Sequence, residues 1–341
     1  MPHQSIEPAQ ILDYAGKSTP RPPSFAARLA TRLLAFRELL LIAIIAAACI
    51  GMAFHPERFL TTGSILAILL NVSVAAIVGI GMTVLLVSGG FDLSVGSTFA
   101  MAGAVTSLFI AKSGLPIPIA ITLGLAAAAF VGLINGLIVA KVGINPFITT
   151  LAMMSIVRGA MQVITDGKDV VSLPKSFNVI GQGKILGVQH PILISLALVL
   201  LGDLLLRKTR FFRQNYYIGG NEKAAILSGI PVNQIKIFNY VLTAALAGLA
   251  GIISTARFGA AALTAGADLE LNVITGVIIG GASLKGGECT VLGSFLGILL
   301  MGIVTPALNH LGVDVYWQML ATGAILLTAV LIDTLSRRRR S

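Results

Sequence analysis

Long apolar runs separated by short polar segments make up most of this 341-residue sequence. An apolar run of about 20 residues is long enough to cross a bilayer as a helix. The pattern predicts an all-α, polytopic membrane protein with about ten transmembrane helices, several of them short. We expect the spans near residues 39–54, 62–88, 95–111, 118–140, 146–164, 191–206, 237–257, 271–283, 291–308 and 317–332. The second is longer than a perpendicular helix needs, so it should tilt or break.

The polar segments predict how the spans are oriented. Basic residues gather in residues 1–37, 207–236 and 337–341, as they do on the cytoplasmic side of membrane proteins. An even number of spans also puts both termini on one side. The predicted organisation is a cytoplasmic N-terminal tail (1–37), a membrane domain (38–336) containing a cytoplasmic loop at 207–236, and a basic cytoplasmic C-terminus (337–341). Residues 166–189 form the longest loop on the opposite side.

The basic loop contains signals for one small helix, in the stretch IGGNEKAAILSGIPV. Asn221 is a good N-cap, and Glu222 suits the positive end of the helix dipole. Gly229 and Pro231 then end the helix. A helix this short is not stable alone, so it needs a partner surface.

The apolar residues of this helix indicate where the partner binds. Ile226 and Leu227 are expected to be exposed, and Ala225 is expected to lie in the same packed contact. The alternative is that the segment is only a solvated turn between two membrane helices.

Four blocks of the sequence, in this order, resemble one family. SGGFDLSVGS (88–97), INPFITTLAMMSIVRG (144–159), IGGNEKAAILSGIPV (218–232) and VIIGGASLKGG (277–287) are similar to blocks of bacterial ABC-importer permeases of the ribose, xylose and arabinose family. The resemblance covers residues 51–333. It implies that the small helix is the coupling helix that docks on the ATPase subunit. The implied coupling residues are Gly219, Gly220, Asn221, Glu222, Lys223, Ala224, Ala225, Ile226, Leu227 and Gly229.

Composition excludes several other classes of protein. Only 11% of residues are charged, whereas about a quarter are charged in a soluble domain. The net charge of +10 lies in the tails and the central loop, with no basic face interleaved with aromatic residues, so we expect no nucleic-acid partner. The sequence contains no GxxxxGK[ST], GxSxG or HExxH motif. The chain is therefore predicted not to be an enzyme, with no metal or cofactor of its own and with ATP and Mg on the partner ATPase.

Two groups of polar residues are candidates for a substrate pathway. Asp92 and Ser94 follow two glycines, so this stretch is either a tight turn with an aspartate cap or part of the pathway. Asn135, in the fourth span, either bridges two helices or faces the same path.

The second group lies in the fifth span. Ser155, Arg158 and Gln162 recur at helical spacing and share one face with Thr165. Either they line a water-filled path that suits a hydroxyl-rich sugar, or Arg158 extends to the membrane interface. Asp203 and Arg207 are expected to form a stabilising pair without a transport role.

The resemblance implies a machine with several components. This chain would be the permease subunit of an importer in the bacterial inner membrane, surrounded by lipid and paired with an identical or different second permease. An ATPase subunit and a periplasmic or extracellular sugar-binding protein would complete it, and the cargo would be a monosaccharide. One alternative is another small polar solute, such as a branched-chain amino acid. The other is an ion-coupled secondary transporter, which needs a carboxylate near the bilayer midplane, whereas Asp92 and Asp203 lie near span ends.

Overall fold

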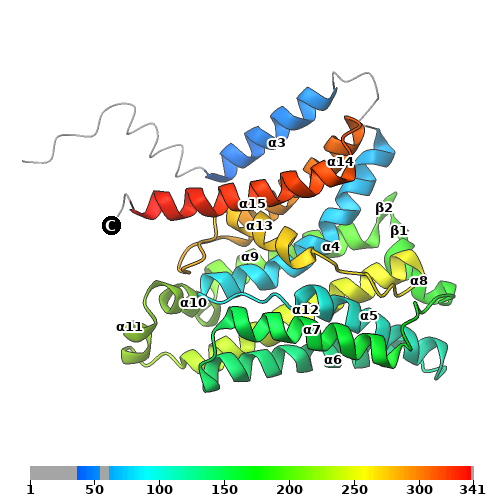
Figure 1. Ribbon diagram of the computed structural model, residues 1–341, viewed down its shortest axis with the longest axis horizontal. Coiled ribbons are helices and arrows are strands. Elements are labelled where there is room, and N and C mark those ends of the chain that lie inside the picture. The colour runs from blue at the N-terminus through cyan, green and yellow to red at the C-terminus, as the bar shows by residue number, and fades with distance from the viewer. Residues whose placement is uncertain (1–36, 54–60, 339–341) are drawn as a thin grey trace, which may run out of the picture. The chain divides into compact units, whose positions relative to one another are not determined.

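Backbone polar groups have no water partners inside a bilayer, so apolar runs of this kind must form helices. The computed structural model describes residues 37–53 and 61–338, and most of that part is helical. Strands β1 (Lys184–Ile185) and β2 (Val188–Gln189) form one short antiparallel hairpin. The helices, shown in Figure 1, are α3 (Arg37–Ala53), α4 (Thr62–Val87), α5 (Val95–Ala111), α6 (Ile117–Leu137), its π-helical continuation η1 (Ile138–Val142), α7 (Pro146–Ile164), α8 (Lys175–Gln182), α9 (His190–Lys208), α10 (Arg210–Gly220), α11 (Glu222–Leu227), α12 (Val232–Phe258), α13 (Leu269–Ile279), α14 (Val291–His310) and α15 (Val315–Arg338).

The predicted spans coincide with apolar helices. Six helices of the described part are long and apolar enough to cross a membrane, and four shorter apolar helices occupy the remaining predicted positions. The polytopic all-α fold is thereby confirmed. The side of the membrane that each terminus occupies stays a prediction, and the predicted tail at 1–37 lies almost wholly outside the described residues.

Several boundaries differ from the prediction. α4 is one continuous helix of 26 residues and does not break. α12 begins at Val232 rather than at 237, because its first turns pack Val232 and Ile235 against α10 and α11. α13 ends at Ile279, before the glycines Gly280 and Gly281. α15 continues through residue 338, past the predicted domain boundary at 336.

α12 lies at the centre of the helix packing, in contact with α4, α5 and α6. Small residues permit this close approach, as is common between membrane helices. A Cβ at Gly81 of α4 would lie 2.6 Å from the Cα of Thr243, and one at Gly251 would overlap the carbonyl oxygen of Phe99. α4 contacts α9, α13 and α14 on its other sides.

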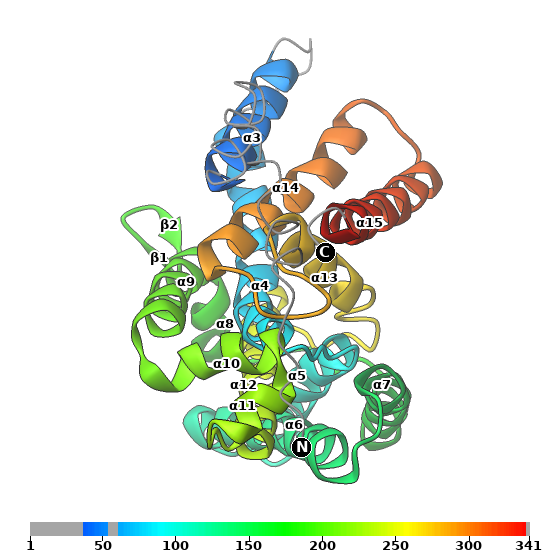
Figure 2. The ribbon, with the colours of Figure 1, turned by 90° about the vertical axis from the view of Figure 1, so that its left-hand side faces the viewer.

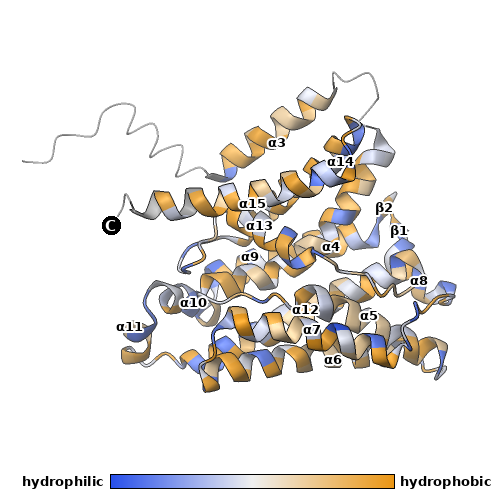
Figure 3. Cartoon of the chain, viewed as in Figure 1, coloured by the Kyte–Doolittle hydropathy of each residue, from blue (hydrophilic) through white to orange (hydrophobic). Residues whose placement is uncertain are grey.

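Many of the outward side chains of the long helices are apolar. Phe130, Ile156 and Leu204 are 62%, 60% and 55% exposed, and Figure 3 shows that most residues of the long helices are apolar. Such exposure is costly in water and is expected next to lipid.

The short elements lie at opposite ends of the long helices. In Figure 1, α10 and α11 lie at one end, and α8 with the β1–β2 hairpin lies at the other. Figure 2 looks onto the α10–α11 end. α9 runs from the hairpin to α10, and its 19 residues span about 28 Å at the helical rise of about 1.5 Å per residue. The two predicted polar loops, 166–189 and 207–236, therefore lie at opposite ends of the long helices.

Candidate functional site

The predicted small helix is present as α11. The side chain of Asn221 accepts a hydrogen bond of 3.0 Å from the backbone N–H of Ala224, which is the predicted cap. Glu222 occupies the first turn, and its carboxylate pairs with Lys236 of α12 at 2.7 Å. Gly229 follows with a φ of 79°, a left-handed conformation that glycine adopts without strain.

The exposure of the α11 side chains differs from the expectation at one residue. Leu227 is 89% exposed and Ile226 is 55% exposed, as predicted. Ala225 is only 3% exposed, because it packs within this chain against Ile218 and Val232. The expectation that Ala225 contributes to the partner contact is wrong. A substitution there would disturb the chain itself.

The α10 helix was not predicted from the sequence. Gly219 and Gly220 were expected to lead into the small helix, but they form the last turn of α10. Its inward face includes the buried Asn215 and Ile218 and the partly buried Phe212, at a spacing of three residues. That periodicity was a signal for an amphipathic helix, obscured by the basic and aromatic residues beside it.

The C-terminal end of α10 meets two distant loops through glycine backbones. The N–H of Gly287 donates a hydrogen bond of 2.8 Å to the carbonyl oxygen of Val87, the last residue of α4. A Cβ added at Gly219 would overlap that same carbonyl oxygen, and it would lie 2.5 Å from the nitrogen of Gly287. A Cβ at Gly286 would lie 2.8 Å from the Cα of Gly219 and 2.9 Å from the nitrogen of Gly89. We call the contact of Val87, Gly89, Gly219, Gly286 and Gly287 the glycine junction.

A buried chain of polar side chains runs beside the glycine junction. Asn239 of α12 donates to the side-chain oxygen of Asn215 in α10 at 2.7 Å and to the hydroxyl of Ser88 at 3.1 Å. Asn215 and Asn239 are both fully buried, so these bonds have no solvent competitor. Three of the four sequence blocks that resemble the permease family, residues 88–97, 218–232 and 277–287, therefore meet at this place in the structure.

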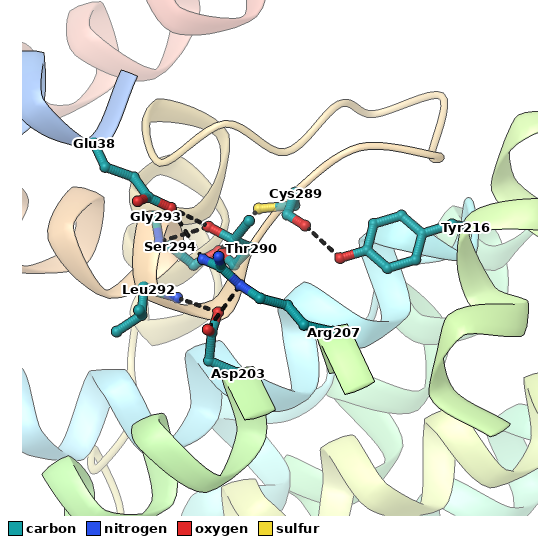
Figure 4. A network of polar contacts seen from close by, with 9 residues as sticks. All are labelled: Glu38, Asp203, Arg207, Tyr216, Cys289, Thr290, Leu292, Gly293 and Ser294. Atoms are coloured by element: carbon teal, nitrogen blue, oxygen red, sulfur yellow. Dashed lines mark hydrogen bonds and ion pairs between the residues drawn. The ribbon is translucent and has the colours of Figure 1, made fainter. Parts of the chain in front are cut away.

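A second polar network joins α9, α3 and the start of α14 (Figure 4). Arg207 Nε pairs with the Asp203 carboxylate at 2.8 Å, which is the predicted pair. Asp203 also accepts from the backbone N–H of Leu292 at 3.1 Å. Glu38 of α3 accepts from the hydroxyl of Thr290 at 2.8 Å and from Arg207 at 3.3 Å.

Tyr216 extends this network to α10. Its hydroxyl donates a hydrogen bond of 2.7 Å to the carbonyl oxygen of Cys289. Burial raises the pKa of Tyr216 to about 12, so the hydroxyl keeps its proton at neutral pH and remains a donor. The loop between α13 and α14 is thus held by α10 at the glycine junction and again at Tyr216.

The candidate pathway residues Asp92, Ser94 and Asn135 do lie together, but they bond to one another. Asp92 accepts from the backbone N–H and the hydroxyl of Ser94, at 2.7 and 2.6 Å. Asn135 of α6 donates to Asp92 at 3.3 Å and to the Ser94 hydroxyl at 2.9 Å. All three are fully buried. This geometry supports the interpretation as an ordered turn before α5, with Asn135 as the bridge from α6.

The candidates on α7 do not join that cluster. Ser155 and Gln162 are exposed on the surface of the chain. Arg158 donates to the carbonyl oxygens of Leu263 and Ala265, at 2.8 and 2.9 Å. The guanidinium therefore binds the segment between α12 and α13.

The sequence reasoning missed Glu270. This acid lies in the first turn of α13 and is only 9% exposed. It lies next to Gly96 of α5, where an added Cβ would overlap its carboxylate. An acid inside the start of an apolar run, two residues after Asp268, was the available signal.

Comparison with known proteins defines the class of this one. The family described as "Branched-chain amino acid transport system / permease component" matches residues 64–330, and the chain belongs to this family. It is similar to the ribose import permease of Escherichia coli K12, with 40% identity over 299 residues, or 86% of this chain and 92% of the relative. The ribose import permease of Bacillus subtilis 168 is 42% identical over 278 residues, or 81% of this chain and 86% of the relative.

A third relative transports a different sugar. The L-arabinose transport system permease of Escherichia coli K12 is 37% identical over 300 residues, or 88% of this chain and 91% of the relative. The comparison with solved structures found no match. Membership of this family, together with the membrane-length helices, makes the chain a multi-pass protein of the bacterial inner membrane.

Proposed function

We propose that this chain is the permease subunit of an ABC importer for a monosaccharide of the ribose and arabinose class. The observation that carries the proposal is identity of 37–42% to ribose and arabinose permeases over more than 80% of the chain. The partners in this proposal are an ATPase subunit, an external sugar-binding protein and a second permease copy, identical or different.

The geometry at α10 and α11 indicates how ATP hydrolysis on the partner would act on this chain. Exposed Ile226 and Leu227 provide the contact with the ATPase, while Ala225 fixes α11 to the chain. Movement of α11 is transmitted through α10 to the glycine junction. There it reaches the turn between α4 and α5 and the loop before α14 together.

In this proposal the candidate pathway residues have different roles, which follow from their exposure and their hydrogen bonds. Ser155 and Gln162 are exposed on α7 and offer hydrogen bonds to a neutral, hydroxyl-rich sugar in a path completed by the second copy. Arg158 positions the segment between α12 and α13 beside that path. Asp92, Ser94 and Asn135 order the turn before α5. ATP and Mg bind the ATPase subunit, so the purified chain alone neither binds nor hydrolyses ATP.

The experiment that tests this function is reconstitution in proteoliposomes with a candidate ATPase subunit and a candidate sugar-binding protein from the same organism. Radiolabelled ribose, arabinose and leucine are offered separately. We expect ATP-dependent accumulation of a pentose and none of leucine. Accumulation of leucine alone would reassign the cargo to branched-chain amino acids, and ATP turnover by the pure permease would overturn the class.

A substitution pair tests the role of α11. Leu227→Asp puts a charge into the proposed interface and should reduce co-purification of the ATPase about tenfold or more, since about 1.4 kcal/mol changes an affinity tenfold. Leu186→Asp is the matched control, because Leu186 is 99% exposed at the opposite end of the helices. Equal recovery of the ATPase with both variants would show that α11 is a solvated turn.

A further inference from the structure

A groove of about 660 Å³ lies between α10 and α11. Arg210, Arg213 and Tyr217 of α10 line one side, and Asn221 and Ala224 contribute to the other. In Figure 1, α10 and α11 lie together at one end of the long helices. The groove adds a second contact surface next to the exposed side chains of α11.

The groove is positively charged without a carboxylate to balance it. Arg210 and Arg213 are both exposed, three residues apart on one helix. Within residues 37–53 and 61–338, neither forms an ion pair with Asp or Glu. Glu222, the acid of α11, is paired with Lys236 at 2.7 Å and does not line the groove. A bound segment that carries carboxylates would supply the missing charge.

The rest of the lining is mixed in character. Tyr217 is 57% exposed, Ala224 is also exposed, and both line the groove. Leu227, which is 89% exposed, lies on the adjoining helix. Aromatic and apolar surface next to arginine is typical of the central residues of protein interfaces. The occupant therefore combines acidic side chains with apolar ones, as a protein segment does and a bare phosphate does not.

We propose that this groove receives an acidic segment of the ATPase subunit, with its carboxylates against Arg210 and Arg213. The inference rests on the proposed function, because the ATPase is the partner that reaches α11. α10 is then a second docking element, and the charge complementarity selects which ATPase binds. A membrane with anionic headgroups is the competing occupant, and the test below separates it from the ATPase.

The test measures the affinity of the ATPase subunit for the permease in nanodiscs. One set contains only phosphatidylcholine, and the other also contains phosphatidylglycerol, each at low and at high salt. We expect the double variant Arg210→Ala/Arg213→Ala to bind about tenfold or more weakly at low salt in both lipids, with a smaller salt dependence than the wild type. Lys208→Ala is the matched control, since Lys208 is exposed on the same segment but does not line the groove. Unchanged unfolding midpoints show that all variants are folded.

A conservative variant identifies the bound carboxylate. Arg213→Lys keeps the charge and introduces an amine that a carbodiimide can join directly to a neighbouring carboxylate. We expect near wild-type affinity for this variant and a cross-link to one acidic segment of the ATPase, located by mass spectrometry. The wild type, which retains Lys208, reports the background.

Three other results of these binding measurements would contradict the inference. An affinity loss confined to phosphatidylglycerol nanodiscs assigns the arginines to lipid and overturns the inference. Equal affinity of the double variant and the Lys208→Ala control in both lipids also overturns the inference. If Leu227→Asp still weakens binding of the ATPase in that case, the proposed function is unaffected. A wild-type chain that binds no ATPase subunit overturns both.

Discussion

The backbone N–H of Gly287 donates a hydrogen bond of 2.8 Å to the carbonyl oxygen of Val87. These residues are 200 positions apart in the sequence, and Gly219 of α10 packs against both of them. The contact joins the end of α4, the loop before α14 and the segment next to the proposed ATPase contact. Under the proposed function, a movement of α10 would act through this contact on α4 and on the loop before α14 together.

Gly219→Ala should disrupt this contact. The new Cβ would overlap backbone atoms of Val87 and Gly287 and crowd the Cα of Gly286, and these atoms cannot move aside as flexible side chains do. We expect a loss of about 1–3 kcal/mol in the free energy of unfolding and a fall in ATP-driven uptake at matched expression. Gly323→Ala on α15 is the control, since nothing lies within 4 Å of its Cβ position. Equal stability and uptake of the two variants would contradict the close packing described here.

The buried chain from Asn215 through Asn239 to Ser88 can be tested by a double-mutant cycle. Asn239→Leu removes both donated hydrogen bonds and leaves the Asn215 oxygen without a donor, at a cost of about 1–3 kcal/mol. Adding Asn215→Leu should cost less than the sum of the single substitutions, because the second removes an already unpaired group. Unfolding of the four proteins in detergent measures the coupling. Strict additivity would mean that the two asparagines do not interact.

The two acids of the network in Figure 4 should differ in importance. The side chain of Asp203 is 10% exposed, whereas that of Glu38 is 43% exposed and its partner Arg207 is 41% exposed. Glu38→Gln should change the free energy of unfolding by no more than about 1 kcal/mol, as for other solvent-screened pairs. Asp203→Leu should cost about 2–3 kcal/mol, because the backbone N–H of Leu292 also loses its acceptor. The reverse order in unfolding measurements would show that α3 is held chiefly through Glu38.

The orientation of the chain is open to a labelling experiment. After Cys49 and Cys289 are replaced by alanine, single cysteines are placed at Lys175 and Lys223, which are exposed at opposite ends of the long helices. Lys175→Cys should react with an impermeant thiol reagent on intact cells, and Lys223→Cys only after the membrane is opened. The opposite pattern would reverse the predicted topology.

The positions of the membrane helices could be predicted because apolar length alone determines them. The cap at Asn221 and the stop at Gly229 were also local signals, and both are present. α10 was missed because a basic, aromatic segment was interpreted as a loop. The burial of Ala225 was missed for a different reason. It depends on Ile218 and Val232, which belong to neighbouring helices rather than to α11 itself.

For the candidate sites, too, contacts between distant segments could not be predicted from the sequence. Asp92 was identified after two glycines and Asn135 inside the fourth span, but their mutual hydrogen bond spans 43 positions of sequence. Spacing along one helix placed Arg158 with Ser155 and Gln162. It could not reveal the carbonyl oxygens of Leu263 and Ala265 that bind the guanidinium. Sequence identified which residues are unusual, and the tertiary fold decided their partners.

The glycine junction is built from main-chain atoms, and this has a mechanical consequence. Side chains yield to a displacement by rotating about their torsions, so a contact made of side chains is compliant. Gly89, Gly219 and Gly286 have no side chains to rotate, and their peptide planes are stiff. No side-chain rotation can absorb a displacement at this contact, so under the proposed function a stroke delivered to α10 would be passed to the α4–α5 turn.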